Sequence, residues 1–512
     1  MTRERLAAID IGTNSIRCIV VETDRSGTFK ILDDEKVTVR LGEGLNQSGM
    51  LSPAACSRAL DALSRLKKII DGYGARAIEA VATSAVRKAA NGPDFIETIK
   101  SQVGLTVQTI SGEEEAELAA LSAFNNFDLE GIRQLLIDIG GGSLELVTTV
   151  GHHIDEIASL ELGAVYLTET FLHSDPVTPK EIQKLRRHIR KTIKDAFPSD
   201  MVTVSGLIGS GGTITAIGSM VMASRREEYG SLHGYEVLRS DIVHLLAMLL
   251  RKSTKELRSV PGLNPDRADI IIAGVTVVDE LMDMIQANLL RINERGIREG
   301  LILKGLQRHE LSRSDKKKRS WQSSVLEFAT SCHFDEKHSL HVARLSLEIF
   351  EAVAKPFNLG GNARRILEAA AILHDIGYFI NYSSHHKHSY HLIRHADLFD
   401  FNPRERELIA HVARYHRKSL PKKKHDQFMR LSPSDQVMVS RLGGILRLAD
   451  GLDRRRNSII RSVDCSMSDQ SLVVRLHGSE DLSVEQFGGL AKGDLFQTAF
   501  AIRLDLQPVP AD

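Results

Sequence analysis

The feature of this sequence that most constrains its fold is an internal repeat. The segment IDIGTNS at residues 9–15 returns 128 residues later as IDIGGGS at residues 137–143. Each copy is an apolar run that ends in Asp-Ile-Gly, followed by a turn of small residues and a second apolar run, which predicts a strand-turn-strand hairpin. Two copies of one design predict two related halves, each a mixed sheet covered by helices.

Changes in residue composition and in the hydrophobic pattern divide the rest of the chain into segments. After Gly305 the sequence is polar, basic and free of glycine for a stretch, which predicts a linker. A helical region then holds 12 of the chain's 20 histidines, and the final stretch alternates apolar and polar residues as strands do. The predicted segments are a first α/β domain at 1–127, a second at 128–305, a linker at 306–320, an all-α domain at 321–460 and a small β-rich domain at 461–512.

Composition narrows the possible partners and compartment. The 66 Lys and Arg balance the 66 Asp and Glu, so no overall charge favours nucleic acid or an anionic membrane. The longest uncharged run, residues 208–224, is rich in Gly, Ser and Thr and is typical of a loop and a buried helix rather than a membrane span. Four cysteines lie far apart without a C-x-x-C pair, which indicates a reducing cytoplasm. We expect a cytoplasmic protein with no nucleic-acid or membrane partner.

The repeated turns predict a phosphate site. Small residues after an Asp-x-Gly strand end leave backbone N–H groups pointing at one spot, and such a turn binds anions. A third glycine turn follows the apolar stretch 202–208 and opens a predicted helix, whose dipole would add to the attraction. One such turn alone is more often a hairpin without a ligand, but three together favour phosphate. The candidates are Asp10, Gly12, Thr13, Asn14, Ser15, Gly140, Gly141, Gly142, Ser143, Gly209, Ser210, Gly211, Gly212 and Thr213.

Carboxylates at the same strand ends suit a divalent cation. Asp10 and Asp138 each lie where a predicted strand stops, and either could hold a cation directly or through water. Glu145 follows Asp138 by seven residues on the return strand, which brings its side chain near the end of the strand that carries Asp138. An ordinary exposed strand position remains an alternative for Glu145.

A predicted helix start at Ser111 carries several further carboxylates. Ser111 and Glu114 fit the S-x-x-E capping box, so Glu114 has a structural role. Glu115 has no such role, and near a phosphate site it could orient and deprotonate a water.

Arg87 is a separate candidate near the start of another predicted helix. The helix dipole disfavours a cation there, so this guanidinium could bind a phosphate. A salt bridge to Glu113 or Glu114 is the alternative.

Charge is segregated along the chain. Residues 101–150 contain eight acidic residues and one basic residue, so this region needs a metal ion or neighbouring cations before it could accept phosphate. Residues 361–460 contain 18 basic and 10 acidic residues, which suits a long polyanion, although solvated loops would also explain the excess. The candidate polyanion groove comprises Arg417, Lys418, Lys422, Lys423 and Lys424.

These motifs together resemble the Ppx/GppA family of exopolyphosphatases and guanosine pentaphosphate phosphatases, within the actin-like superfamily. The markers run in the family's order through the first 306 residues, and the basic stretch at 414–418 resembles the long exopolyphosphatases. The marker segments are 8–15, 82–87, 110–116, 137–145 and 209–213. The resemblance implies an α/β fold with two actin-like (ribonuclease H-like) domains and an active site in the cleft between them.

The resemblance also implies a mechanism. Glu115 would be the general base for water, Arg87 would clamp the terminal phosphoryl group, and Asp138 with Glu145 would hold Mg²⁺ or Mn²⁺. Water would attack the terminal phosphoanhydride of inorganic polyphosphate in line, releasing one orthophosphate per turnover. The resemblance to long members further implies a homodimer whose basic groove guides the chain processively.

The histidine-rich region resembles an HD domain in three places, at His338 to Ala343, at His374-Asp375 and at Leu448 to Asp450. This resemblance implies a second divalent metal site formed by His338, His374, Asp375 and Asp450. His341 shares a helix face with His338 and is the alternative first ligand. The domain could bind metal, catalyse a reaction of its own, or simply pack its histidines in a core.

Two other functions remain open. The same site could act on guanosine pentaphosphate (pppGpp), because pppGpp and polyphosphate both present a terminal phosphoanhydride to the same groups. It could also bind ppGpp. Alternatively, the actin-like halves could form a nucleotide-regulated binding module, with the HD domain as the only enzyme.

Overall fold

The computed structural model describes residues 4–23, 29–196, 204, 206–311, 319–468, 470–478 and 481–509. The chain forms two compact units. Unit 1 comprises Met1–Glu228 and Leu232–Lys318, and unit 2 comprises Tyr229–Ser231 and Arg319–Asp512. Most of the predicted linker, residues 312–318, lies outside the described residues.

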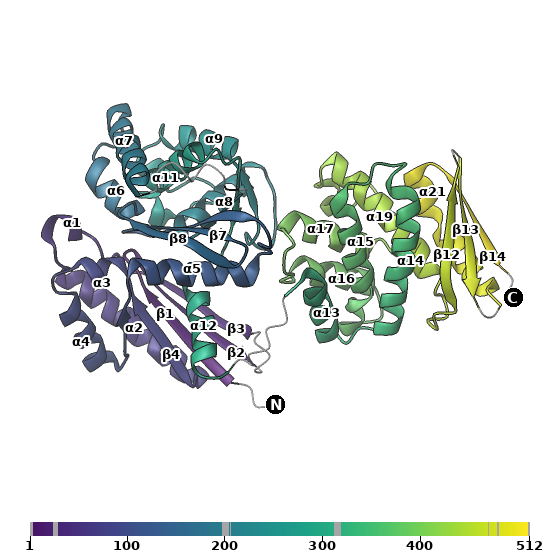
Figure 1. Ribbon diagram of the computed structural model, residues 1–512, viewed down its shortest axis with the longest axis horizontal. Coiled ribbons are helices and arrows are strands. Elements are labelled where there is room, and N and C mark those ends of the chain that lie inside the picture. The colour runs from purple at the N-terminus through teal and green to yellow at the C-terminus, as the bar shows by residue number, and fades with distance from the viewer. Residues whose placement is uncertain are drawn as a thin grey trace. The chain divides into compact units, whose positions relative to one another are not determined.

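Unit 1 contains two sheets that share one topology (Figure 1). In each sheet a central strand has an antiparallel hairpin partner on one side and a parallel strand on the other. The first sheet has the order β3 (Phe29–Thr38), β2 (Ser15–Thr23), β1 (Glu4–Ile11), β4 (Ala77–Ala82), β5 (Gln108–Thr109). The second has the order β8 (His153–Leu160), β7 (Leu144–Val150), β6 (Arg133–Ile139), β9 (Gly206–Ser210), β11 (Leu289–Ile292), β10 (Glu236–Leu238).

The two predicted hairpins are confirmed, down to the hydrogen bond that closes each turn. Gly12 N donates to Ser15 O at 3.2 Å in the first, and Gly140 N donates to Ser143 O at 3.0 Å in the second. Because the same bond closes both turns, the sequence repeat is a repeat of backbone structure, and each central strand ends at an equivalent point.

Helices cover the sheets and bring the two halves together. The helices α2 (Pro53–Tyr73) and α4 (Gly92–Val103) bury their apolar residues against one face of the first sheet. On the other face, α5 (Gly112–Asn126) places Leu118 and Ala119 in the core of the first sheet, and Ala116, Ala120 and Ala123 in a core with the second. Figure 1 shows α5 running between the two sheets. Its many alanines allow this close approach on both sides.

The last helix of unit 1, α12 (Ile297–Arg308), follows the second sheet in the chain but packs on the first. Its Leu301, Ile302 and Leu306 share a core with Leu6 and Ala8 of β1. The remaining helices of unit 1 are α1 (Leu45–Ser48), α3 (Ser84–Lys88), α6 (Ala164–Phe171), α7 (Pro179–Ala196), α8 (Gly212–Ser224), α9 (Arg239–Leu249), α10 (Thr254–Leu257), η2 (Pro265–Arg267) and α11 (Ile271–Met284).

Unit 2 is a helical bundle joined to a small sheet through one continuous core. Its helices are α13 (Trp321–Ser331), α14 (Glu336–Ala354), α15 (Gly361–Leu373), η3 (Ile376–Phe379), α16 (His385–Arg394), α17 (Pro403–Arg414), α18 (Asp426–Met429) and α19 (Pro433–Gly451). The sheet comprises β12 (Ile460–Met467), β13 (Ser471–Gly478) and β14 (Arg503–Val509).

The prediction of a helical region followed by a β-rich segment is confirmed. The structure adds two helices between β13 and β14, α20 (Ser483–Lys492) and α21 (Asp494–Phe500), that the sequence analysis did not predict. Within the described ranges, no helix combines the length and apolar character that a membrane crossing requires.

Candidate active site

The turns that end the central strands of the two sheets contact each other. A Cβ atom added to Gly141 would lie 2.9 Å from Cβ of Thr13, and one added to Gly142 would collide with Oγ of Ser84. Gly211, which follows β9, has a φ of +94°, and an added Cβ would lie 2.6 Å from the carbonyl oxygen of Ile139. Glycine is required at these positions because a side chain would push the loops apart.

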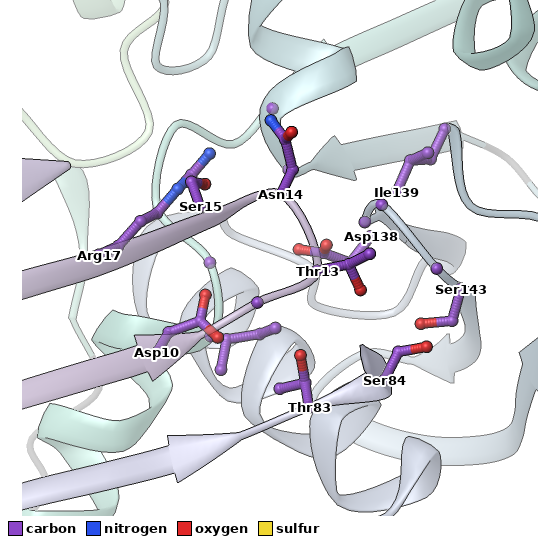
Figure 2. A pocket seen from close by; sticks show the side chains of 18 of the residues that line it. Asp10, Thr13, Asn14, Ser15, Arg17, Thr83, Ser84, Asp138, Ile139 and Ser143 are labelled. Carbon is purple, nitrogen blue, oxygen red and sulfur yellow. The ribbon is translucent and has the colours of Figure 1, made fainter. Parts of the chain in front are cut away.

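A cavity lies where these turns meet (Figure 2). Figure 2 shows Asp10, Thr13 and Ser84 of the first half gathered around the same space as Asp138 and Ser143 of the second. The residues that line the cavity are Asp10, Gly12, Thr13, Asn14, Ser15, Arg17, Thr83, Ser84, Glu115, Asp138, Ile139, Gly140, Gly141, Gly142, Ser143, Gly211, Gly212, Arg267, Glu294, Gly296, Ile297 and Arg298.

Most of the residues predicted from sequence lie at this cavity, but five do not line it. Gly209 lies inside β9, where an added Cβ would meet Ile214 and Leu290, and Thr213 packs against Gly274. Ser210 donates a hydrogen bond from Oγ to the carboxylate of Asp138. Glu145, like Ser210, lines a second cavity that shares Asp138 with the first, and Arg87 contacts Glu115.

Arg87 contacts the carboxylate of Glu115. Its Nη1 donates to the carbonyl oxygen of Ile110 at 2.7 Å and to Oε2 of Glu115 at 3.4 Å. The helix α3 has only five residues, and Arg87 lies in its last turn. The helix dipole therefore does not disfavour this cation, contrary to the argument made from the sequence. The observed partner is also neither Glu113 nor Glu114.

The start of α5 positions Glu115. Ser111 and Glu114 form the predicted capping box, with Ser111 N donating to Glu114 Oε2 at 2.9 Å and Glu114 N donating to Ser111 Oγ at 3.1 Å. This prediction is confirmed. Because both ends of the box are tied to the helix backbone, the next residue, Glu115, is held with its side chain 5% exposed at the cavity.

Asp138 and Glu145 form an acidic pair, in which Asp138 lines this cavity and both residues line the second one. They lie directly opposite each other in the register of β6 and β7. Ser159 Oγ donates to Glu145 Oε1 at 3.0 Å, while Glu145 Oε2 is a buried atom without a hydrogen-bond partner, as is Asp10 Oδ1.

The buried carboxylates raise one another's pKa values. Burial raises the pKa of Glu145 to about 8, and the charge of Asp138 adds to this. Burial, followed by the charge of Glu145, raises the pKa of Glu115 well above its ordinary value. Burial also raises the pKa of Asp10 to about 6, although Arg17 opposes the shift. Such a cluster is unfavourable without a cation nearby.

The donor set fits a hard divalent cation. All the groups concerned are carboxylates, and two of their buried oxygens lack partners. Magnesium prefers oxygen ligands, and one or two carboxylates commonly hold it beside substrate phosphates. Asp138 and Glu145 are therefore suitable ligands on chemical grounds.

Three arginines also line the cavity, and the sequence analysis did not single them out. Arg17 lies opposite Asp10 in the register of β1 and β2. Among the described residues, the guanidinium groups of Arg17 and Arg267 form no hydrogen bond or ion pair. Burial lowers the pKa of Arg267 to about 10, and the charge of Arg17 adds to this. The third, Arg298, pairs with Asp34. Arg267 is buried and Arg17 is partly buried, and two cations so placed favour an anionic ligand.

In unit 2 the predicted metal-site residues lie close together, with additional histidines. Ligand atoms of His338, His374 and Asp450 form one group within 4.8 Å, and those of His374, Asp375 and His416 form another. The Nδ1 atom of His341 instead contacts Nη2 of Arg344 at 3.1 Å. Nothing in the sequence analysis singled out His416 or its neighbour His385.

The residues of the candidate polyanion groove follow α17. Lys418, Lys422, Lys423 and Lys424 are exposed, and Arg417 is partly buried. The Nη1 atom of Arg417 donates to Nε2 of His385 at 3.2 Å.

The two sheets of equal topology, with a cavity at the turns between them, define the actin-like class of proteins. Residues 19–309 match the sequence model of the Ppx/GppA phosphatase family, and residues 321–495 match that of Ppx/GppA phosphatase domain III. The first match alone spans more than half of the chain, and this protein belongs to the Ppx/GppA phosphatase family.

Solved structures support the same assignment. The Ppx/GppA family member of Aquifex aeolicus is 28% identical, with a TM-score of 0.53, over 60% of this chain and 99% of its own. An exopolyphosphatase of Cytophaga hutchinsonii is 25% identical, with a TM-score of 0.57, over 60% of this chain and 100% of its own. An exopolyphosphatase-like protein is 26% identical, with a TM-score of 0.57 and the same coverage.

Proposed function

We propose that this family phosphatase is an exopolyphosphatase, which removes the terminal phosphate from inorganic polyphosphate. One observation carries the proposal: three carboxylates (Asp10, Glu115 and Asp138) and two arginines (Arg17 and Arg267) line one cavity bordered by glycine turns, and the buried Glu145 lies opposite Asp138. Carboxylates suit a cation and an attacking water, whereas the arginines suit further phosphates of an extended substrate. The likeness to an exopolyphosphatase of Cytophaga hutchinsonii supports this choice.

In the proposed reaction the turns hold the terminal phosphoryl group. Backbone N–H groups at residues 13–15 and 141–143 would donate to its oxygens, and Arg17 and Arg267 would neutralise the phosphates that follow. Asp138 and Glu145 would hold Mg²⁺ or Mn²⁺, which when bound neutralises charge on the phosphoryl oxygens. The protein's main contribution is then to fix the water and the phosphorus atom in line.

Glu115 would take the proton from the attacking water. Its raised pKa makes the carboxylate a stronger base than an exposed glutamate. Arg87, which donates to Oε2 of Glu115 at 3.4 Å, would keep the base oriented and favour its charged form. Arg87 would therefore act on the base as well as, or instead of, clamping the phosphoryl group.

The proposal is tested by Glu115→Gln, which keeps the shape of the side chain but removes the base. We expect orthophosphate release from polyphosphate to fall by about 100-fold or more at saturating substrate. Glu113→Gln is the matched control, because Glu113 lies two residues away and is exposed, and it should keep its rate. An unchanged rate in Glu115→Gln would instead support a nucleotide-regulated binding module in unit 1.

A second candidate substrate is pppGpp. The observation that favours it is the Arg17–Arg267 pair, because two adjacent cations could equally bind the second diphosphate or the base of a guanosine nucleotide. Rates of orthophosphate release from long polyphosphate and from pppGpp, measured side by side on the full chain, decide between them.

The proposed polyanion groove has its own test. Reversing the charge of Lys422, Lys423 and Lys424 to Glu should weaken the binding of long polyphosphate far more than the hydrolysis of short chains. Affinity of the unaltered protein for long chains should fall as salt increases. Equal effects on both chain lengths would rule out a groove at these lysines.

A further inference from the structure

The side chain of Asp375 lies between two pairs of histidines in unit 2. Its Oδ2 atom faces His338 Nε2 at 3.9 Å and His374 Nε2 at 3.6 Å. Its Oδ1 atom faces His385 Nε2 at 3.1 Å and His416 Nε2 at 3.5 Å. The two oxygens of one carboxylate therefore point to two separate positions.

A second carboxylate completes the first of these positions. Oδ1 of Asp450, on α19, lies 3.5 Å from His338 Nε2 and 3.9 Å from His374 Nε2. The side chains of His338, His374, His385 and His416 are at most 1% exposed. They come from α14, the end of α15, the start of α16 and the end of α17, so packed helices fix the whole group.

Hydrogen bonds on the far side of each ring fix which nitrogen faces the centre. Nδ1 of His374, His385 and His416 lies within 2.7, 3.0 and 2.7 Å of the backbone carbonyl oxygens of residues 371, 382 and 413. A carbonyl oxygen only accepts, so these three nitrogens carry the proton. Nδ1 of His338 similarly donates to Oδ2 of Asp453 at 2.7 Å. Histidines that ligate metals are typically held in this way.

The central Nε2 atoms are consequently acceptors, and each lies beside a carboxylate oxygen, which is an acceptor too. Nε2 of His338 and of His374 are buried and have no hydrogen-bond partner. Nε2 of His385 and of His416 lie 3.4 Å apart, each beside Oδ1 of Asp375. Lone pairs and carboxylates collected in this way repel one another unless cations lie between them.

We propose that unit 2 binds two divalent transition-metal ions that share Asp375 as a bridging ligand. The first ion takes His338, His374 and Asp450, and the second takes His385 and His416. Four imidazoles and two carboxylates favour Mn²⁺, Fe²⁺, Co²⁺ or Zn²⁺ over Mg²⁺. The site is independent of the polyphosphate proposal, which concerns the oxygen ligands of unit 1.

Three basic side chains contact the same ligand atoms. Lys492 Nζ bonds to Asp450 Oδ2, Arg456 Nη2 bonds to Asp375 Oδ2, and Arg417 donates to His385 Nε2. The side chains of Lys492 and Arg456 are 22% and 37% exposed, so both can turn towards solvent. Once displaced by the ions, these cations would border the site and favour a phosphate-type anion as its ligand.

The rival account is that these basic groups are themselves the permanent counter-ions. A proton on His338 would contribute: burial lowers the pKa of His338, but the neighbouring carboxylates of Asp450 and Asp453 outweigh burial and raise it to about 9. The rival predicts no transition-metal binding at the cluster, so metal stoichiometry separates the two accounts.

The test is equilibrium dialysis of the full chain against Co²⁺ in the presence of excess Mg²⁺, which competes at the oxygen ligands of unit 1. We expect two Co²⁺ ions per chain at the cluster. The double variant His385→Gln, His416→Gln should lose one ion, and Asp375→Asn should lose or greatly weaken both. His391→Gln, an exposed histidine on the same helix as His385, is the matched control and should keep both. Asp138→Asn in unit 1 should also keep both.

Electron paramagnetic resonance of the Mn²⁺-loaded chain tests the shared ligand, because two ions bridged by one carboxylate give a coupled spectrum. If the unaltered chain binds one Co²⁺ or none, or if the double histidine variant retains two, the proposal is wrong. The count on the unaltered chain decides even if a variant fails to fold.

Discussion

The two repeated hairpins differ in the charge of the residue opposite the aspartate, and this difference separates their chemistry. In both, the residue seven positions after the aspartate lies directly opposite it on the return strand. Opposite Asp10 that residue is Arg17, whereas opposite Asp138 it is Glu145. The turn hydrogen bonds are the same. The repeat thus keeps the backbone but has a cation in one copy and an anion in the other, which in the proposed function would serve substrate phosphates and a metal ion respectively.

Among the variants that test this difference between the hairpins, Glu145→Gln should have the largest effect on activity. The change removes the charge that distinguishes the second hairpin and weakens the proposed metal ligand. We expect orthophosphate release to fall by more than about 100-fold and the Mg²⁺ concentration for half-maximal rate to rise. A magnesium titration of the rate measures both. A normal magnesium requirement in this variant would remove the metal role from the second hairpin.

Arg17→Ala should have the next largest effect, and of a different kind. Loss of a charge-assisted contact to phosphate costs about 1.5–3 kcal/mol, which is about 10–100-fold in kcat/KM. We expect the change mainly in KM, with the magnesium requirement unaltered. Arg17→Lys should recover part of the loss because it restores the charge without the planar fork. If Arg17→Ala altered the magnesium requirement instead, the two hairpins would share one task.

Ser159→Ala should give a smaller change in the second hairpin alone. Ser159 donates to Glu145 Oε1 at 3.0 Å and so orients that carboxylate. Its removal should raise the magnesium requirement by about tenfold, without a change in the KM for polyphosphate. The titration used for Glu145→Gln measures this, and an effect on KM alone would contradict it.

The smallest expected effect is on stability as a function of pH. The folded chain keeps the protons of Asp10 and Glu145 up to about pH 6 and about pH 8, whereas the unfolded chain releases them at lower pH. In that window the folded state binds more protons, so the free energy of unfolding falls as pH rises. Without divalent ions, the thermal midpoint of unit 1 should drop by a few degrees between pH 5 and pH 8. Glu145→Gln should reduce the dependence of the thermal midpoint on pH. Added Mg²⁺ should raise the midpoint of the unaltered chain most at pH 8. A midpoint that rises between pH 5 and pH 8 would refute this explanation.

Much of the candidate site can be predicted from the sequence repeat. Two equal motifs predict two equal strand ends, and the capping box at Ser111 predicts where Glu115 begins its helix turn. Arg17 was also within reach, because its spacing from Asp10 equals that of Glu145 from Asp138. The sequence analysis used this spacing for Glu145 in the second hairpin but not for Arg17 in the first.

Other site residues depend on packing that no local pattern encodes. Arg267 ends a three-residue 3-10 helix, and an added Cβ at Gly212 would collide with its guanidinium. Only the tertiary fold brings these two together. Likewise, His385 begins α16 and His416 follows α17, at no fixed spacing from His374-Asp375. The excess of histidine was visible, but which ones converge was not.

The return of α12 to the first sheet has a consequence for how the protein is made. Leu6 and Ala8 are synthesised before the second half of unit 1, yet their core is closed by Leu301, Ile302 and Leu306, which follow that half in the chain. During synthesis this face of the first sheet is therefore covered only in part, by α5, until the second half has been translated. Chaperones that shield apolar surface on nascent chains would find it there.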